Sequence, residues 1–364
     1  MTRAPSKIKV LIADDSVVYR SQIRSALTAI PRVELVGASS SGKLTLERLS
    51  SGGVDLVILD LEMPEMGGIE TLRELRRLGH SCKVLIFTSN SASSAELTLE
   101  ALKLGATDFI NKPDSSGGGA DPARRIREIL EPKIQSFFPE KALDPEAMDA
   151  IPPSSSYPQV HWDLLKPKII LIGSSTGGPG VLEKIFAEVR PPLACPIVIA
   201  QHMPPVFTAT FAHRLSSISG IPAREAEHGK PLEPGCIHVA PGDHHLTLTG
   251  SPELVKMHLD QGPKVHSVRP AVDPLFRSAA KIFKTRCLAF VLTGMGADGR
   301  DGAIAVKQHG GAVVIQSEKT CVVFGMPGAV HAAGAFDRIA SPAEIISILK
   351  EKAVLHGKLT SAKP

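Results

Sequence analysis

The chain has 364 residues, of which 43% are apolar and 21% charged, and its formal net charge is +4. This composition can bury substantial hydrophobic cores, and the length suggests two domains. The sequence contains neither a basic stripe interleaved with aromatic residues nor an apolar run long enough to cross a bilayer, which argues against nucleic-acid binding and against direct membrane insertion.

The cysteines and the N-terminus indicate where the protein works. Five cysteines are scattered along the chain without C-x-x-C spacing, as expected for reduced core thiols. The first residues run into a short strand and lack the apolar stretch of a signal peptide. We therefore expect a cytoplasmic protein.

Short apolar runs alternate with amphipathic segments over residues 7–130. The expected strands are KVLIAD, VELVGA, VDLVILD, KVLIFT and TDFIN, in that order. The segments between them, such as VYRSQIRSALTAI and GIETLRELRRLG, repeat apolar residues at helical spacing. Five βα units of this kind predict a doubly wound α/β domain.

The composition changes over residues 131–166, where a tract rich in proline, serine and alanine indicates an interdomain linker. A second α/β pattern follows over residues 167–355. Its expected strands are KIILIG, PIVIAQH, GCIHVAP, CLAFVLTG and GAVVIQS. The chain is thus expected to hold two doubly wound α/β domains joined by a linker.

Polar residues end several expected strands of the first domain. Asp14 and Asp15 follow the first strand, Asp60 ends the third, Thr88 ends the fourth and Lys112 follows the fifth. The carboxyl ends of parallel strands meet at one edge of a sheet, so these groups should converge there. Three carboxylates suit Mg²⁺, and a carboxylate beside a cation and an ammonium group can accept a phosphoryl group. A single such aspartate could equally be a helix cap.

This set of motifs, DD, D-x-x-M-P-x-M-x-G, T-S and K-P, resembles the response-regulator receiver domain, a flavodoxin-like fold. The resemblance implies that Asp60 is the phospho-acceptor for a histidine kinase and that Phe109 takes an aromatic switch position. It implies that Thr88 and Lys112 contact the phosphoryl group. The implied Mg²⁺ site consists of Asp14 through water, Asp15, Asp60 and the backbone of Glu62.

A glycine-rich turn, GSSTGG, follows the first strand of the second domain and places Ser175 in a G-x-S-x-G pattern. Glycines on both sides permit a strained turn, and a helix N-terminus next to it favours an anion. The turn alone fits a nucleophilic serine and a phosphate-binding loop equally well.

A nucleophilic serine needs a base and an acid, and two later strand ends supply them. His202 follows the strand PIVIAQ, and Asp298 lies in the turn MGADG after CLAFVLTG. Asp273 and Asp301 remain alternatives for the acid. The chain order Ser, His, Asp differs from that of the usual α/β-hydrolases.

The motifs GSSTGG, QHMPPVFT, RPAVDPLF and LTGMGADG, behind a receiver-like domain, resemble the chemotaxis-type protein-glutamate methylesterases of the CheB family. The resemblance implies demethylation of glutamyl methyl esters, and deamidation of glutamines, on methyl-accepting chemoreceptors, without a cofactor for ester hydrolysis. It implies a triad of Ser175, His202 and Asp298, and an oxyanion hole formed by the N–H groups of Thr176 and Met295. It also implies that an unphosphorylated receiver inhibits the esterase.

Two positions depart from the pattern expected of this family. Ser174 stands where alanine is expected, and Ala271 stands where RPSVD would have serine. Ser174 leaves open which hydroxyl reacts. Two other functions compete with the hydrolase, namely a non-catalytic regulator that binds a partner and an enzyme that uses the glycine-rich turn to bind phosphate.

Overall fold

The structure is a computed structural model that describes residues 7–113, 121–139, 154 and 156–354. The chain divides into two compact units between residues 143 and 144. Among the described residues, no helix has the length and apolar character needed to cross a bilayer. Each unit is built around its own parallel sheet, which confirms the expected class of two α/β domains.

The first unit contains a five-stranded parallel sheet in the order β2-β1-β3-β4-β5. Its strands are β1 (Ile8–Ala13), β2 (Val33–Ser39), β3 (Leu56–Leu59), β4 (Lys83–Thr88) and β5 (Asp108–Asn111). Because the strand order reverses between β1 and β3, the carboxyl ends of these two strands flank the crevice where such sheets bind ligands. All five expected strands are present.

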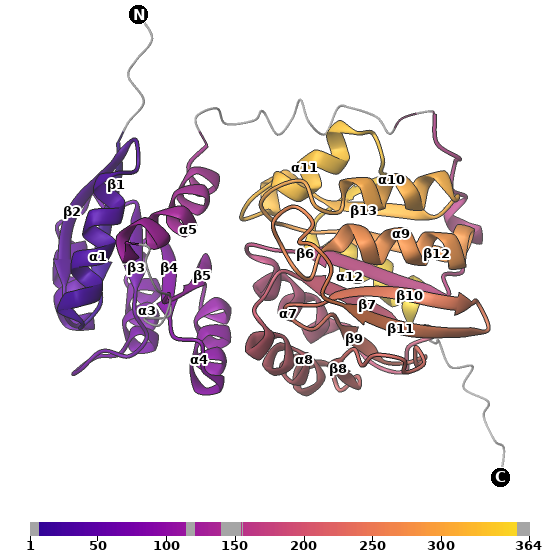
Figure 1. Ribbon diagram of the computed structural model, residues 1–364, viewed down its shortest axis with the longest axis horizontal. Helices are drawn as coiled ribbons and strands as arrows, with labels where there is room; N and C mark the ends of the chain where they lie inside the picture. The colour runs from indigo at the N-terminus through magenta and orange to yellow at the C-terminus, as the bar shows by residue number, and fades with distance from the viewer. Residues whose placement is uncertain (1–6, 114–120, 140–153, 155, 355–364) are drawn as a thin grey trace, which may run out of the picture. The chain divides into compact units, whose positions relative to one another are not determined.

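Among the described residues of this unit, five helices pack on the sheet (Figure 1). They are α1 (Val17–Thr28), α2 (Gly42–Ser50), α3 (Gly68–Arg77), α4 (Ala92–Lys103) and α5 (Pro122–Phe137). Helix α5 continues past residue 130, the expected end of the domain, and buries Ile134 and Phe137. We therefore propose to place the end of the first domain after α5. Of the expected linker 131–166, residues 140–153 and 155 lie outside the described residues.

The second unit has a seven-stranded parallel sheet in the order β14-β13-β12-β6-β7-β9-β8. The strands are β6 (Ile169–Ser174), β7 (Ile197–Gln201), β8 (Ala223–Glu225), β9 (Ile237–Val239), β12 (Cys287–Val291), β13 (Ala312–Gln316) and β14 (Arg338–Ala340). The first strand of the unit, β6, lies between β7 and β12, so the carboxyl ends of these three strands are neighbours. The five strands expected here are present, and β8 and β14 are additional.

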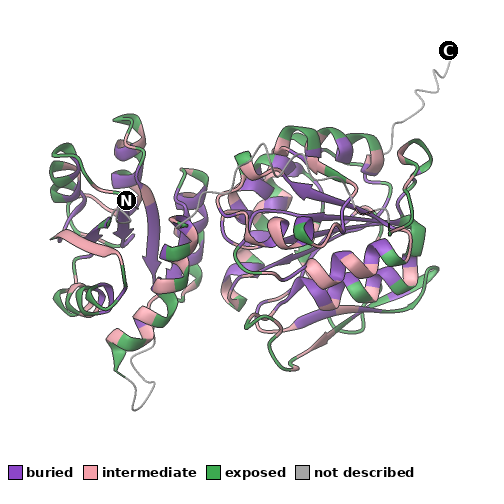
Figure 2. Cartoon of the chain, turned by 90° about the horizontal axis from the view of Figure 1, so that it is seen from above, coloured by how far each residue is buried: buried purple, intermediate pink, exposed green. Residues whose placement is uncertain are grey.

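An antiparallel hairpin of β10 (His245–Ser251) and β11 (Leu254–Asp260) lies beside α9 and was not expected (Figure 1). The helices of this unit are α7 (Gly178–Glu188), α8 (Pro205–Ser219), α9 (Val272–Phe283), α10 (Arg300–Gln308), α11 (Gly325–Ala332) and α12 (Pro342–Ala353). The part of this unit that the structure describes also contains the short 3₁₀ helices η1 (Trp162–Leu164), η2 (Lys284–Arg286) and η3 (Glu318–Thr320). Figure 2 shows that the central strands are buried and that the helices expose their outer faces.

The later part of the expected linker packs against this second unit. The buried Lys307 ammonium donates to the carbonyl oxygen of Pro158, and Lys352 donates to that of Trp162. The guanidinium of Arg338 stacks over the Trp162 ring, 3.9 Å from its centroid. Because these contacts tie the segment to the sheet and its helices, we propose that the second domain begins near residue 156.

Candidate functional site

The acidic residues of the first unit converge at the strand ends. Asp14 follows β1, Asp60 follows β3, and both are buried, whereas Asp15 is exposed. One carboxylate oxygen of each of the three residues lies within 4.8 Å of the others. Three like charges at this spacing repel one another unless a cation lies between them.

Lys112 reaches this cluster from the end of β5. Its ammonium lies 2.6 Å from Asp60 Oδ2 and 3.2 Å from Asp14 Oδ2. The rings of Tyr19 and Phe87 lie beside the same ammonium, with centroids 4.8 and 5.5 Å away. The lysine is therefore held both by charge and by two aromatic faces.

Whether the cluster of Asp14, Asp15 and Asp60 suits Mg²⁺ depends on the protonation and the hydrogen bonds of its carboxylates. Burial raises the pKa of Asp60 to about 6, although the hydrogen bond from Lys112 opposes it. Asp14 Oδ2 is buried and, apart from the Lys112 ammonium 3.2 Å away, has no donor among the described residues. A hard divalent cation would stabilise both the buried Asp14 oxygen, which can accept a further partner, and the Asp60 carboxylate, whose charged form is disfavoured by burial, so the residues fit Mg²⁺.

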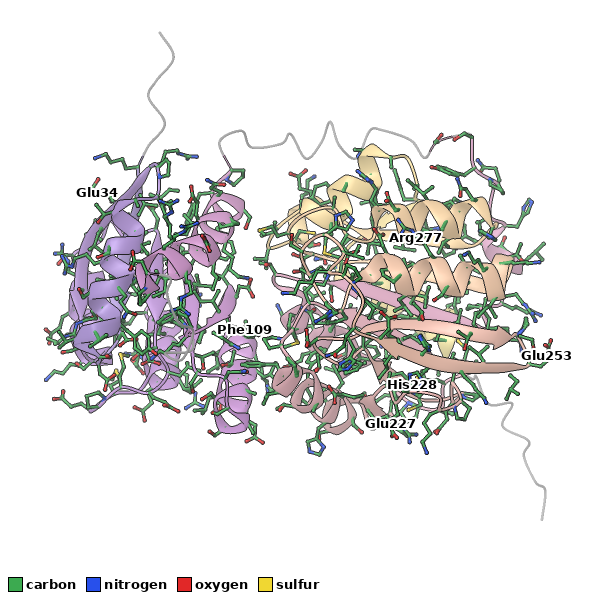
Figure 3. The ribbon with its side chains drawn as sticks, viewed as in Figure 1. Glu34, Phe109, Glu227, His228, Glu253 and Arg277 are labelled. Carbon is green, nitrogen blue, oxygen red and sulfur yellow. The ribbon has the colours of Figure 1, made fainter. Side chains whose placement is uncertain are left out.

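The remaining predicted residues of the receiver lie around this cluster. The backbone N–H of Glu62 donates to Asp60 Oδ1 at 3.3 Å, which places this segment beside the carboxylate. Thr88 is buried at the end of β4, and its hydroxyl accepts a 3.3 Å hydrogen bond from Thr98. Phe109, labelled on β5 in Figure 3, is also buried.

In the second unit, Ser175 lies on the turn between β6 and α7. Its N–H donates to the carbonyl of Thr293 at 3.0 Å, and its carbonyl accepts from Gly178 at 2.9 Å. The turn requires glycine at position 177, where φ is +77° and a Cβ would lie 2.5 Å from Val322. A serine held by its backbone on a strand-to-helix turn can present its hydroxyl at the edge of the sheet.

The sheet brings His202 next to this serine. Ser174 pairs with Gln201 in the register of β6 and β7, so Ser175 and His202 leave the sheet from adjacent positions. The N–H of His202 donates to the carbonyl of Ser174 at 3.1 Å. The predicted nucleophile and the predicted base therefore follow paired residues of neighbouring strands.

Asp298 is the acid that the structure places against His202, with 2.7 Å between Nε2 and Oδ2. Its carboxylate also accepts from the N–H groups of Val272 at 2.6 Å, Asp273 at 3.0 Å and Gly299 at 2.9 Å. Burial alone would raise the pKa of Asp298, but the hydrogen bonds from His202 and the backbone outweigh it and hold the pKa below its usual value. The carboxylate therefore stays ionised while the imidazole gains and loses a proton.

The two alternative acids have other partners. Asp273 accepts from His266 at 3.0 Å and from the N–H groups of Gly299 and Gly302. Asp301 pairs with Arg277 and with Arg300 at the surface.

Two residues that support this site received no role from the sequence, although both lie inside the motifs used above. Gln201 accepts from the Ser174 hydroxyl at 2.6 Å and donates through Nε2 to the carbonyls of Ser175 and His202. Thr293 donates to the carbonyl of Thr176 at 2.9 Å. Their positions in the sequence could have pointed to them, because Gln201 immediately precedes His202 and Thr293 lies two residues before Met295.

Ser174 itself is fully buried, and its hydroxyl is directed to Gln201. Thr176 is also buried, whereas Met295 is 37% exposed. A Cβ on Gly294 would lie 2.8 Å from the Cβ of Ser175, so the backbone that leads to Met295 passes close to the serine. This places both candidate oxyanion residues on segments that border Ser175.

Comparison with known proteins identifies the family. The family described as CheB methylesterase matches residues 170–349, and the response regulator receiver domain matches residues 10–117. A protein-glutamate methylesterase/protein-glutamine glutaminase of Nocardioides sp. is 40% identical over 91% of this chain and 92% of its own length. The chain belongs to the CheB methylesterase family.

Other relatives agree with this assignment. The protein-glutamate methylesterase/protein-glutamine glutaminase of Thermotoga maritima is 36% identical over 91% of this chain and 94% of its own length. The crystal structure of the Thermotoga maritima CheB methylesterase catalytic domain is 44% identical, with a TM-score of 0.50, and covers 51% of this chain and 99% of that domain. The CheB member described here is thus a methylesterase of chemotaxis that carries a receiver domain, as the sequence predicted.

Proposed function

We propose that this CheB protein hydrolyses the methyl esters of glutamate side chains on chemoreceptors, with Ser175 as nucleophile, His202 as base and Asp298 as the residue that orients the base. The observation that carries the proposal is the hydrogen bond between His202 and the buried Asp298, beside the turn of Ser175. Relatives named protein-glutamate methylesterase/protein-glutamine glutaminase support the choice of substrate.

In the first half of the reaction, His202 takes the proton of the Ser175 hydroxyl while the oxygen attacks the ester carbonyl. The negative charge that forms on the carbonyl oxygen is stabilised by the N–H groups of Thr176 and Met295. The imidazolium of His202 then gives its proton to the leaving methoxide, and methanol departs. Asp298 stabilises the imidazolium throughout, since it remains ionised.

In the second half, water attacks the glutamyl ester of Ser175, and His202 again takes a proton and returns it to the serine oxygen. The receptor leaves with a free glutamate carboxylate. The same sequence with ammonia as leaving group converts glutamine to glutamate, so one site serves both activities. Serine, imidazole and carboxylate supply the nucleophile, the base and its orientation, and we propose that ester hydrolysis uses no cofactor.

A phosphonate directed at serine tests this proposal against a phosphate-binding turn. We expect the full chain to be labelled at Ser175, with loss of methanol release from methylated receptor in proportion to the label. Peptide mapping by mass spectrometry locates the modification. Label on Ser174, or full labelling without loss of turnover, would contradict the proposal.

We propose further that Asp60 accepts a phosphoryl group from a chemotaxis histidine kinase and that phosphorylation activates the esterase. Asp14 through water, Asp15, Asp60 and the backbone of Glu62 would hold Mg²⁺, which would neutralise charge on the phosphoryl oxygens. Lys112, already 2.6 Å from Asp60, would hold the transferred group together with Thr88. The five cysteines are all free, which supports work in the reducing cytoplasm.

The raised pKa of Asp60 makes Mg²⁺ binding sensitive to pH. With a pKa of about 6, this carboxylate becomes mostly protonated when the pH falls from 7.5 to 5, and Mg²⁺ loses a ligand. We expect Mg²⁺ affinity to fall about ten-fold over this interval, whereas a carboxylate at the usual pKa would change little. Isothermal titration calorimetry of Mg²⁺ into the full chain measures the change.

Asp60→Asn is the matched control for this measurement, because it keeps the shape of the side chain but cannot be ionised. We expect its weak Mg²⁺ binding to vary much less between pH 7.5 and 5. Equal affinity of the unmodified chain at both pH values would show that Asp60 is not a ligand that titrates near pH 6.

A further inference from the structure

Thr293, two residues beyond the end of β12, is bonded through every polar group it has. It is fully buried, and its N–H donates to Oε1 of Gln316 at 2.9 Å. Its carbonyl accepts from the N–H of Ser175 at 3.0 Å, and its hydroxyl donates to the carbonyl of Thr176 at 2.9 Å. One threonine therefore holds both the proposed nucleophile residue and the residue that follows it.

The hydroxyl oxygen of Thr293 is an acceptor as well. The N–H groups of Val322 and Val323, just before α11, donate to it at 3.0 and 3.1 Å. The carbonyl of Val323 lies 3.2 Å from the same hydroxyl, but it already accepts from the N–H of Gly294 at 3.0 Å. The shorter distance assigns the hydroxyl hydrogen to the carbonyl of Thr176. The hydroxyl therefore uses its donor and both lone pairs, which holds it in a single orientation.

The segment from Thr293 to Met295 is held by the start of α11. The carbonyl of Gly294 accepts from the N–H groups of Gly325 at 3.0 Å and Met326 at 2.8 Å. This carbonyl and the N–H of Met295 belong to one trans peptide group, in which the two point in opposite directions. The N–H of Met295 is therefore directed away from α11.

The N–H of Thr176 is aimed in the same way. It shares a trans peptide group with the carbonyl of Ser175, which accepts from the N–H of Gly178 at 2.9 Å and from Nε2 of Gln201 at 3.0 Å. The N–H of Thr176 therefore points away from these two donors. Each candidate oxyanion donor thus has its direction fixed by hydrogen bonds to the carbonyl of its own peptide group.

The distance between the two donors depends on the bonds that join their segments, because the donors follow different strands, β6 and β12. Both donors stabilise a developing oxyanion only if each lies about 2.7–3.1 Å from the same oxygen. The segments are joined by the bond from the N–H of Ser175 to the carbonyl of Thr293 and by the bond from the Thr293 hydroxyl to the carbonyl of Thr176. The second bond comes from a side chain, so a substitution can remove it.

We propose that Thr293 is a positioning residue whose hydroxyl sets the spacing of the two oxyanion donors, the N–H groups of Thr176 and Met295. This inference rests on the proposed function, because that function aims both groups at the ester carbonyl oxygen. Without the hydroxyl, the turn of Thr176 and the segment before α11 lose their shared partner, and the two donors can move apart. The donors act on charge that exists only in the transition state, so the loss should appear in kcat and leave ester binding unchanged.

Thr293→Val keeps the shape of the side chain and removes the hydroxyl. In the full chain with a small phosphodonor, we expect kcat and kcat/KM for methanol release from methylated receptor to fall together by about 30-fold, with KM changed less than about two-fold. The second-order rate constant for labelling of Ser175 by a serine-directed phosphonate should fall by a similar factor. In that reaction the phosphoryl oxygen takes the place of the ester carbonyl oxygen, and no receptor is needed.

Thr293→Ser is the conservative variant, because it keeps the hydroxyl and removes only the methyl group. We expect its kcat to stay within about three-fold of that of the unmodified chain. Thr293→Cys has nearly the size of serine, but its thiol is a weak donor and a weak acceptor. We expect its kcat to lie about ten-fold below that of Thr293→Ser, and this comparison decides the question if Thr293→Val does not fold.

Thr208→Val is the matched control for the loss of a buried hydroxyl. Thr208 on α8 is fully buried, and its hydroxyl donates to the carbonyl of Pro205 at 2.8 Å and accepts from the N–H of Gly242 at 3.0 Å. We expect Thr208→Val to lower the midpoint of thermal unfolding, as Thr293→Val does, but to change kcat less than about two-fold. A purely structural role of Thr293 would likewise lower stability and leave the kcat of the folded variant unchanged.

The inference would be overturned if folded Thr293→Val kept kcat within about two-fold of the unmodified chain, or if its loss were confined to KM. Equal kcat values for Thr293→Cys and Thr293→Ser would overturn it too. A loss in Thr293→Ser as large as in Thr293→Val would assign the effect to the methyl group, and an equal loss in Thr208→Val would assign it to the fold. Turnover retained by Ser175→Ala would instead refute the proposed function, whatever the threonine variants do.

Discussion

Replacement of Ser175 by alanine should lower kcat for methanol release by about 10⁴-fold or more. The serine oxygen forms the bond to the receptor carbonyl, and no other group in the site can replace it. The fold should remain, since Ser175 contacts Thr293 and Gly178 through its backbone, which alanine retains. Single-turnover assays with methylated receptor measure the loss, and circular dichroism and thermal unfolding establish that the variant is folded.

Ser174→Ala is the matched control, because it removes the neighbouring hydroxyl from the same turn. Ser174 is fully buried and donates to Gln201, so its loss removes one hydrogen bond but no reacting group. We expect kcat to fall by less than about ten-fold. If Ser174→Ala abolished turnover and Ser175→Ala did not, the assignment of the nucleophile would be reversed.

The parallel strands could be predicted because burial on both faces makes each one a continuous apolar run. β3 (LVIL), β6 (IILIGS) and β12 (CLAFV) are buried along their whole length. Their ends could be predicted as well, because a charged or small residue stops each run. This is why Asp60, Ser175 and the turn before Asp298 were found together with the strands that carry them.

Elements with weaker patterns escaped prediction. β8 and β14 have three residues each, too few for a periodic signal. In the β10–β11 hairpin, β10 exposes its last three residues and β11 buries only Val255 and Met257, so neither strand forms a continuous apolar run. The expected first domain ends at residue 130, whereas α5 continues through Pro132 and buries Ile134.

The sequence favoured Asp298 as the partner of His202 but left Asp273 and Asp301 as alternatives, because all three lie near expected strand or helix ends. Spacing along the chain does not tell which carboxylate reaches the imidazole. The structure separates the three by their donors: Asp301 is paired with surface arginines, and Asp273 with His266. The network that links Asp273 to Asp298 joins two helix N-termini distant in sequence, so it becomes visible only in three dimensions.

Asp298→Asn should lower kcat by about 10³- to 10⁴-fold. The carboxylate accepts four hydrogen bonds, whereas an amide has one oxygen and must turn its N–H₂ toward His202 and Val272 or toward Asp273 and Gly299. If the amide N–H₂ faces His202, the imidazole is held in the wrong tautomer. If the N–H₂ faces the backbone N–H groups of Asp273 and Gly299, donors face donors and no hydrogen bond forms there. The pH profile of kcat for methanol release measures the loss, which should persist across the neutral range.

The same substitution should lower the free energy of unfolding by about 2 kcal/mol at pH 7, since buried N–H groups of α9 lose an acceptor. The pKa of Asp298 is depressed in the folded state, so its stabilisation is present above the unfolded pKa and is lost as the pH falls through the folded value. The stability difference between the two chains should therefore shrink below about pH 4.

Asp301→Asn is the control for the loss of kcat, because it removes a surface carboxylate three residues away, and it should change kcat less than about two-fold. A comparable loss of kcat in both variants would mean that the segment, and not the contact with His202, is what the reaction requires.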